Sequence, residues 1–134
     1  MATFKLSVVA PDRTVVEQDV NHVQAHSFGG YMGVMAHHDP MIVALRPGLF
    51  QYTDTSNIQH SIAVTGGFME VSGDGVIVLA DEAHKADEID AKRAEARLEE
   101  ARKALRGEMS SLTRDEARHE MDRALAQLSV ARKK

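Results

Sequence analysis

The sequence predicts an α+β protein, in which an N-terminal antiparallel β-sandwich of about ten strands precedes a C-terminal antiparallel hairpin of two helices. The first observation is the distribution of turn-forming and aromatic residues. Residues 1–86 contain eight of the nine glycines, all three prolines and every Phe and Tyr, whereas residues 87–134 contain only Gly107 of these types. The second is the abundance of Ala, Leu, Glu, Lys and Arg after residue 86, which favours helix. We therefore expect a sandwich domain over residues 1–86 and a helical domain over residues 87–134.

The first 80 residues are predicted to form short strands separated by turns. Residues 4–9 alternate in polarity, and Pro11 presets the backbone of the turn that follows. Further strands are expected over residues 14–18, 20–27, 31–36, 41–45, 49–53, 59–64 and 68–71. The runs 41–45 and 76–80 are apolar throughout, so both are expected to be buried, and 76–80 is expected to be the last strand. Strands at this close spacing are typical of an antiparallel sandwich or barrel.

Two helices are expected after the sandwich. Asp87 is the expected N-cap of the first, and Gly107 ends it after a basic last turn. Thr113 and Glu116 form the signature of a capping box at the start of the second. The apolar positions are Ala91, Ala94, Leu98, Ala101 and Leu105, then Ala117, Met121, Ala124, Leu125, Leu128 and Ala131. Because these stripes are narrow and rich in alanine, we expect a weakly held hairpin that rests on the sandwich or on another protein.

Charge and composition exclude several classes of function. Residues 1–86 carry four Lys and Arg against nine Asp and Glu, and residues 87–134 carry twelve against eleven. Neither half has the basic field of a nucleic-acid binder. The absence of cysteine excludes disulfides and thiolate metal sites. The N-terminus does not resemble a signal peptide and no apolar run approaches the length of a membrane span, so we expect a soluble intracellular protein.

Catalytic signatures do not occur in the sequence. It contains no phosphate-binding loop ending in Gly-Lys-Ser/Thr, no Gly-x-Ser-x-Gly and no His-Glu-x-x-His. His37 and His38 are adjacent, and His22 and His26 share one face of a predicted strand, which raises a metal site as an alternative. Adjacent strand residues point to opposite faces, and structural zinc needs four ligands. We therefore favour exposed histidines and expect no metal.

Arginines recur along both predicted helices, at Arg93, Arg97, Arg102, Arg106, Arg114, Arg118 and Arg123. One interpretation is a solvated surface, in which Glu95 and Glu99 pair with Arg102 and Lys103 at helical spacing. The other is that arginines from both helices converge on phosphate or on the carboxylates of a partner, which the planar guanidinium suits. The residues alone leave both interpretations open.

Four segments carry a resemblance over the whole chain: residues 7–12, 30–40, 64–71 and 128–130. The segment Gly-Tyr-Met-Gly-Val-Met-Ala-His-His-Asp-Pro at 30–40 is similar to Gly-Glu-Leu-Gly-Ile-Leu-Pro-Gly-His-x-Pro, and residues 66–71 fit Gly-Gly-Phe-x-Glu-Val. Both patterns, in this order, are those of the epsilon subunit of bacterial F-type ATP synthases, which the chain therefore resembles. The family fold is a β-sandwich followed by a helical hairpin. Tyr31 replaces the Glu of the family pattern, and Ala36 and His37 replace its Pro-Gly.

A further segment, Ile-Asp-Ala-Lys-Arg-Ala at 89–94, fits the family's nucleotide motif Ile/Leu-Asp-x-x-Arg-Ala at each fixed position. The resemblance implies ATP as a regulatory ligand, with no other cofactor and no magnesium required by the sequence. The residues implied to contact the nucleotide are Ile89, Asp90, Arg93, Ala94 and, over the phosphates, Arg123.

Three positions depart from the nucleotide-binding pattern. His84 stands where binding members have an acid, and Glu116 and Gln127 stand where they have arginines on the second helix. Arg118 is the geometric substitute. Each lost charge-assisted hydrogen bond removes about 1.5–3 kcal/mol, so we expect weakened ATP binding.

The resemblance also implies the function of a non-catalytic rotor subunit in the central stalk of a proton- or sodium-driven ATP synthase. The sandwich would join the gamma subunit to the c-ring. The surface expected to make these contacts comprises Tyr31, Met32, Val34, His37, His38, Phe68 and Glu70. The expected location is the cytoplasmic face of the bacterial plasma membrane, touched only through the complex, with no nucleic acid as partner.

The hairpin is implied to be a regulator. Folded on the sandwich it would permit ATP hydrolysis, and extended along gamma it would inhibit, with Arg114, Arg118 and Arg123 against the catalytic beta and alpha subunits. The alternative is a free-standing nucleotide-sensing or adaptor module of the same architecture, which would purify without gamma. An enzyme is a distant third.

Overall fold

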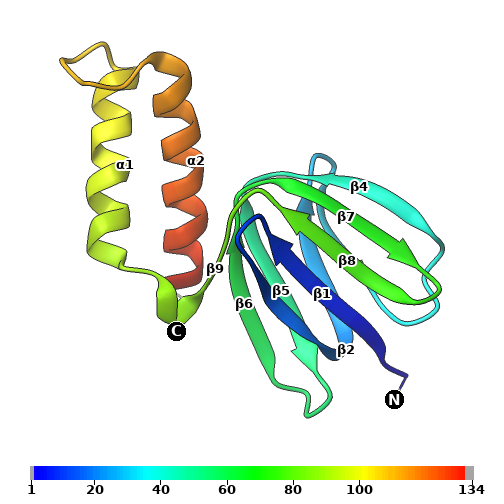
Figure 1. Cartoon of the computed structure of the whole chain (residues 1–134). Coiled ribbons are helices and arrows are strands. Elements are labelled where there is room, and N and C mark those ends of the chain that lie inside the picture. Colours follow the sequence, from blue (N-terminus) through cyan, green and yellow to red (C-terminus); the bar gives the residue numbers. More distant parts are fainter. Residues whose placement is uncertain (1, 132–134) are drawn as a thin grey trace.

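The computed structural model describes residues 2–131, which form nine strands followed by two α-helices (Figure 1). The strands are β1 (Phe4–Ala10), β2 (Arg13–Ser27), β3 (Gly30–Val34), β4 (Met41–Leu45), β5 (Gly48–Asp54), β6 (Gln59–Val64), β7 (Gly67–Ser72), β8 (Gly75–Ala80) and β9 (Ala83–Lys85). A short 3₁₀ turn, η1 (Ala86–Glu88), leads to α1 (Ala91–Leu105) and α2 (Arg114–Ala131). No helix within residues 2–131 is both long enough and apolar enough to cross a membrane.

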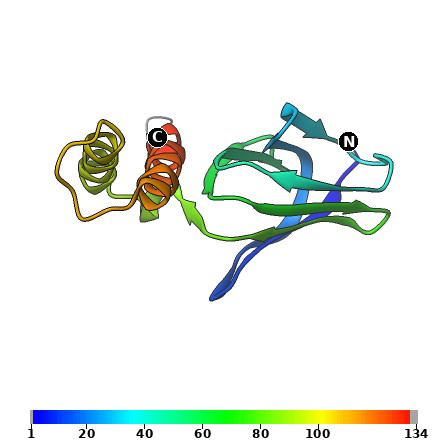
Figure 2. The same cartoon turned by 90° about the horizontal axis from the view of Figure 1, so that it is seen from above.

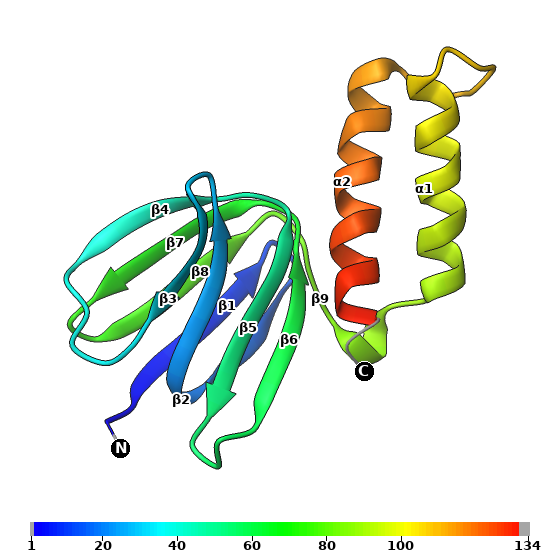
Figure 3. The ribbon, with the colours of Figure 1, turned by 180° about the vertical axis from the view of Figure 1, so that it is seen from behind.

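The strands form one sheet that folds over itself into a two-layered sandwich, in the order β1-β8-β7-β4-β2-β5-β6-β9. The long strand β2 pairs with β1 through its first half and with β3 and β5 through its second, so it belongs to both layers (Figure 3). The predicted sandwich is confirmed, but one pairing is not antiparallel, because β8 runs parallel to β1. The β7–β8 hairpin sets the direction of β8, and the first strand of the chain then closes this layer beside it.

Three strand predictions need correction. The strands expected over 14–18 and 20–27 are one continuous strand, β2, with an irregularity between Val20 and His22 where it pairs with β5. The strand expected over 31–36 ends at Val34. The last strand is β9 rather than β8, and its three residues are too few to show an alternating pattern.

The sandwich core is mainly aliphatic, with Phe50 and Tyr52 as its buried aromatic residues. Its largest fully buried side chains are those of Leu6, Phe50, Ile62 and Met69, with several valines between them. In β1, β7 and β8 the buried residues alternate with outward-facing ones, so the core fills the space between the two layers. This rigid body presents the surfaces described below.

The helix termini follow the expected chemistry with one exception. Thr113 and Glu116 form the predicted capping box, with backbone-to-side-chain distances of 3.0 and 3.2 Å. Gly107 adopts a φ of +82° just after α1, the left-handed conformation that favours glycine there. Asp90, not Asp87, is the N-cap of α1, because its Oδ1 accepts a hydrogen bond from the Arg93 N–H at 3.2 Å and Asp87 lies within η1.

The helices pack against each other through a thin seam, and α2 lies between α1 and the sandwich (Figure 2). The seam comprises Ala94, Leu98, Ala124 and Leu128, with Met121 at its margin. A second apolar face of α2 was not predicted. It places Ala126 and Val130 against Ala63 of β6 and Ile89, so the hairpin rests on the sandwich as expected. Leu125, which was predicted to belong to the apolar stripe, is instead 41% exposed and lies outside the seam.

Candidate functional site

The outer face of strands β4, β7 and β8 carries an exposed apolar surface, here called the outer patch. Its members are Ile42, Ala44, Phe68, Ile77 and Leu79, together with Glu70. The strand register aligns them in two rows, since Ala44 pairs with Phe68 and Phe68 with Leu79, while Ile42 and Ile77 flank Glu70. Ile42 is 72% exposed, and Phe68 and Leu79 are each 58% exposed. An apolar surface of this kind on a sheet usually marks a protein interface.

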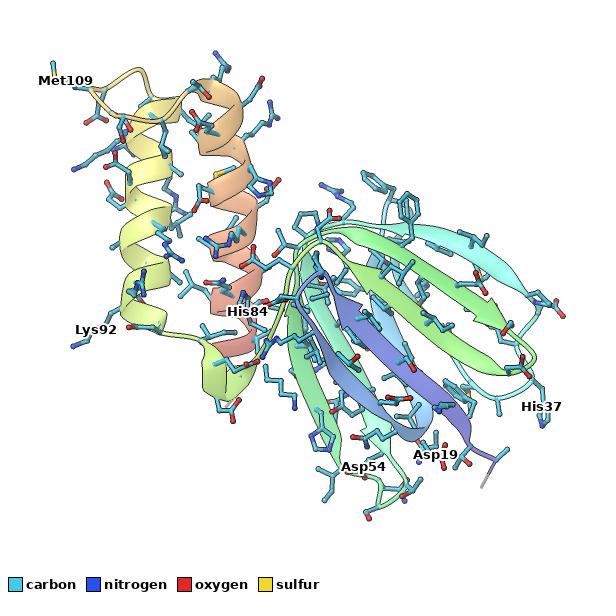
Figure 4. The ribbon with its side chains drawn as sticks, viewed as in Figure 1. Asp19, His37, Asp54, His84, Lys92 and Met109 are labelled. Carbon is cyan, nitrogen blue, oxygen red and sulfur yellow. The ribbon has the colours of Figure 1, made fainter. Side chains whose placement is uncertain are left out.

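The segment 30–40 does not form one continuous surface. Tyr31 stacks on His26 with ring centroids 4.4 Å apart, at the end of the sandwich near the β4–β5 turn. Beside it the Arg46 guanidinium lies 5.6 Å from the centre of the exposed Phe28 ring. His37 lies at the far end of the sandwich (Figure 4). The sequence analysis treated this segment as one contact region, but the fold places Tyr31 and His37 at opposite ends of the sandwich.

Several residues of that segment are poorly placed for contact. Val34 is 1% exposed and belongs to the core, and Met32 packs against it. His37 and His38 lie after β3, so the expectation that they alternate on a strand is wrong. His37 has a φ of +66°, which is the left-handed conformation that glycine adopts at no steric cost but that is strained for other residues.

A charged cluster joins α2 to the sandwich. The Arg123 Nε lies 2.8 and 2.9 Å from the two carboxylate oxygens of Glu82, and its Nη2 lies 2.7 Å from Oε1. His84 Nε2 is 2.6 Å from the same Oε1, and Glu120 Oε2 is 3.5 Å from Arg123 Nη1. Burial raises the pKa of Glu82, but the hydrogen bonds from Arg123 and His84 outweigh it, so the pKa lies below its ordinary value. His84 marks this junction in Figure 4.

A second ion pair fixes the linker between sandwich and hairpin. Arg13, the first residue of β2, forms two hydrogen bonds to the Glu88 carboxylate and one of 3.1 Å to the Ala83 carbonyl. Glu88 also accepts the Lys85 N–H at 2.8 Å. The Arg13 guanidinium and this N–H lower the pKa of Glu88 to about 2 against the cost of burial. The end of β9 and η1 are therefore held against the sandwich.

The residues of the nucleotide motif are divided between packing and solvent. Ile89 is 8% exposed among Ala63, Ala126 and Val130, and Ala94 is fully buried against α2. Asp90 is occupied in capping α1, and Arg93 is exposed. The compact hairpin thus brings Ile89 and Ala94 into the packing of the hairpin, not to an open site.

The arginines of α2 do not share one face. Arg114 and Arg118 are one helical turn apart and exposed, whereas Arg123 lies five residues further and points to Glu82. Of the two residues that replace family arginines, Glu116 is in the capping box and Gln127 is 7% exposed. Arg106, the C-cap of α1, lies 3.4 Å from Glu99, whereas the expected ion pairs of Glu95 and Glu99 with Arg102 and Lys103 do not form in the described part of the chain.

Two sizeable pockets have acidic linings. One of about 660 Å³ lies between the helices, where Glu100, Glu116 and Glu120 outnumber its basic groups. Another of about 590 Å³ lies beside the charged cluster and is lined by Asp81 and Glu88 among other acids. Neither suits a polyphosphate in this conformation. Among residues 2–131, no three His, Cys, Asp or Glu side chains are grouped so as to hold a metal ion.

Sequence reasoning did not single out four large apolar residues that are exposed, namely Phe28, Ile42, Ile77 and Leu79. The apolar runs of β4 and β8 were interpreted as buried strands. A strand with one face in the core and the other in an interface has the same composition. The sequence therefore predicted the apolar character of these strands correctly, but it could not predict which face of each strand is exposed.

Comparisons with known proteins agree on one family. Residues 3–86 match the family model described as ATP synthase, Delta/Epsilon chain, beta-sandwich domain. The chain is 33% identical over 132 residues to the ATP synthase epsilon chain of Syntrophomonas wolfei, covering 98% of this chain and 96% of that one. It is 38% identical over 131 residues to that of Herpetosiphon aurantiacus, covering 96% and 94%.

Among solved structures, a chain of the Euglena gracilis mitochondrial ATP synthase, in a structure of its OSCP, F1 and c-ring, has the same fold. The TM-score is 0.79 at 24% identity, over 100% of this chain and 83% of that chain. The likeness extends over both the sandwich and the helices.

Proposed function

The chain belongs to the family of ATP synthase epsilon chains, a non-catalytic subunit, and on that basis we propose that it joins the gamma subunit to the c-ring and regulates ATP hydrolysis through its hairpin. The outer patch is the single observation that carries the first part. The regulatory role is supported by the thin seam between the two helices and by the separate apolar contact of α2 with the sandwich.

The outer patch is the proposed gamma-binding surface. Its two rows of side chains lie on the sheet, away from the helices, and Glu70 is the charged group in the centre of the row that Ile42 and Ile77 complete. An exposed row such as Ala44, Phe68 and Leu79 gains free energy when a partner removes it from water. Phe68 and Glu70 were predicted contact residues, and the patch extends that prediction to β4 and β8.

The β2–β3 turn is the proposed c-ring contact. Phe28 is 71% exposed and Tyr31 is 53% exposed, with Arg46 against the Phe28 ring. Aromatic and arginine side chains are the types enriched at protein interfaces. His37 and His38, at the opposite end of the sandwich, are proposed as the margin of the gamma contact.

The hairpin is the proposed regulatory element. In the compact position Arg114 and Arg118 are exposed, but Arg123 is paired with Glu82. Extension of the hairpin would release Arg123, so all three arginines could then meet acidic segments of the catalytic subunits. A thin interface allows two positions of similar free energy, between which a ligand or partner shifts the population.

ATP binding is the least supported part of the proposal. Asp90, Arg93 and Arg118 are open to solvent, whereas Ile89 and Ala94 are packed and Arg123 is already paired. A nucleotide would have to displace the Glu82 carboxylate and loosen the hairpin. We therefore propose that ATP binds weakly, with the replacements at Glu116 and Gln127 removing further positive charge.

The experiment that tests the proposal is complex formation with purified gamma and c-ring. A rotor subunit will elute with gamma during size-exclusion chromatography and will bind the c-ring more tightly once gamma is present. A free-standing nucleotide-sensing or adaptor module would elute alone at every concentration. Elution alone would contradict the proposal and favour that alternative.

A further inference from the structure

We propose that Glu82 is an internal anion that latches the hairpin onto the sandwich by holding Arg123, without any nucleotide. The latch is a property of the isolated chain and goes beyond the role proposed for it in the synthase. Arg123 can serve another anion, whether a phosphate or a partner's carboxylate, only after leaving Glu82.

The geometry of the pair is that of a strong ionic contact. Arg123 directs two nitrogens at the Glu82 carboxylate, with Nε at 2.8 and 2.9 Å and Nη2 at 2.7 Å. The side chains are 21% and 29% exposed, so solvent screens the contact only in part. Bonds with two nitrogens fix the orientation of the guanidinium as well as its distance. The contact joins residues 41 positions apart in the chain.

The anion is held by the sandwich and not by the hairpin. Glu82 lies between β8 and β9, and its carbonyl accepts the Thr65 N–H at 2.9 Å, which ties it to the β6–β7 turn. His84, on β9, contacts the same carboxylate oxygen at 2.6 Å. If the Arg123 contact breaks, Glu82 stays in place on the sandwich, and α2 loses its ionic contact with the sandwich.

The rest of the α2 interface with the sandwich is apolar and consists mostly of small side chains. It comprises Ala63, Ala126 and Val130, with Leu49 of β5 and Ile89 of the linker. Alanine side chains bury little apolar surface. One well-oriented ion pair is therefore a sizeable part of what holds α2 down. The Arg13–Glu88 pair holds only the linker, so it would stay intact as the hairpin lifts.

Cysteine labelling can measure the latch because the chain has no cysteine of its own. Ala63→Cys places a thiol at a fully buried position that α2 covers, and its rate of modification reports lifting of the hairpin. Ala25→Cys, fully buried in the sandwich core, reports unfolding of the sandwich. Should Ala63→Cys disturb the interface, Ala126→Cys reports the same opening from the α2 side.

The substitutions are Glu82→Gln and Arg123→Gln, compared with Glu17→Gln, which neutralises an exposed acid paired with Lys5 far from the hairpin. In the isolated chain without nucleotide, we expect each to raise labelling at Ala63→Cys by about fivefold, the scale of a partly buried pair. The double variant should add little to either single one, and labelling at Ala25→Cys should not change.

Three results would overturn the latch. The first is labelling at Ala63→Cys that is the same in Glu82→Gln and Glu17→Gln, which means that the pair contributes nothing to closure. The second is independent, additive effects of Glu82→Gln and Arg123→Gln. The third is an equal rise in labelling at Ala25→Cys, which means that the sandwich itself has opened. None of these outcomes depends on whether the chain binds gamma or ATP, so failure of the latch and failure of the proposed function are distinguishable.

Discussion

Replacing Phe68 with Ala is expected to weaken gamma binding by roughly 30- to 150-fold. A phenylalanine side chain presents roughly 200 Å², so the 58% that the free chain exposes amounts to roughly 115 Å². At about 25 cal/mol per Å², its burial under a partner contributes roughly 2–3 kcal/mol. Phe68 lies at the centre of the Ala44–Phe68–Leu79 row, where contacts contribute most to binding.

Titration calorimetry of purified gamma with each variant measures this change. The matched control is Ile58→Ala, because Ile58 is 57% exposed but lies in the β5–β6 turn, outside the outer patch. We expect the control to bind as the unchanged chain does. Both substitutions are at exposed positions, so thermal unfolding should show similar stability for the two variants. Equal loss of binding in both variants, or no loss in Phe68→Ala, would refute the assignment of the patch.

Three further predictions concern the hairpin and its linker. Because the guanidinium beside Glu88 lowers its pKa from 4.5 to about 2, the pair stabilises the fold above pH 4.5 and this contribution is lost as the pH falls toward 2. In urea unfolding, Glu88→Gln should therefore lower the free energy of unfolding by about 1 kcal/mol at pH 7, a value reduced because the pair is partly exposed to solvent. Near pH 2 the same substitution should leave the free energy of unfolding unchanged. Leu128→Ala should cost about 2 kcal/mol by the same method, since Leu128 is 2% exposed in the seam, while the exposed Leu125→Ala should cost under about 1 kcal/mol. Glu82→Gln should tighten ATP binding several-fold in equilibrium dialysis by freeing Arg123, and unchanged affinity would place Arg123 outside the nucleotide site.

The fold was largely predictable because its signals are local. The change of composition at residue 87 and the capping box at Thr113 and Glu116 each depend on residues close together in the chain. Strand β9 was missed because three residues carry no period. The N-cap was placed at Asp87 in place of Asp90 because both are acids before an alanine-rich segment, and only the 3₁₀ turn η1 separates them.

The contact surfaces were predictable only in part, because tertiary structure decides which apolar or charged residue is free. Phe68 was correctly placed at an exposed strand position, but Val34 belongs to the core. The alternating exposure of Ile77 and Leu79 within an apolar run becomes visible only once β7 and β1 flank β8. Arg123 could be identified as a phosphate-binding candidate from its position, but its pairing with Glu82 joins distant parts of the chain and has no sequence pattern.

The most direct test is ATP hydrolysis by the catalytic core with gamma, assayed with the full chain and with a version that ends at Lys85, the last residue of β9. Both versions retain the outer patch, so both are expected to bind gamma. We predict that only the full chain suppresses hydrolysis, because only it carries the hairpin and its arginines. Equal hydrolysis with the two versions, at equal binding to gamma, would contradict the regulatory role of the hairpin.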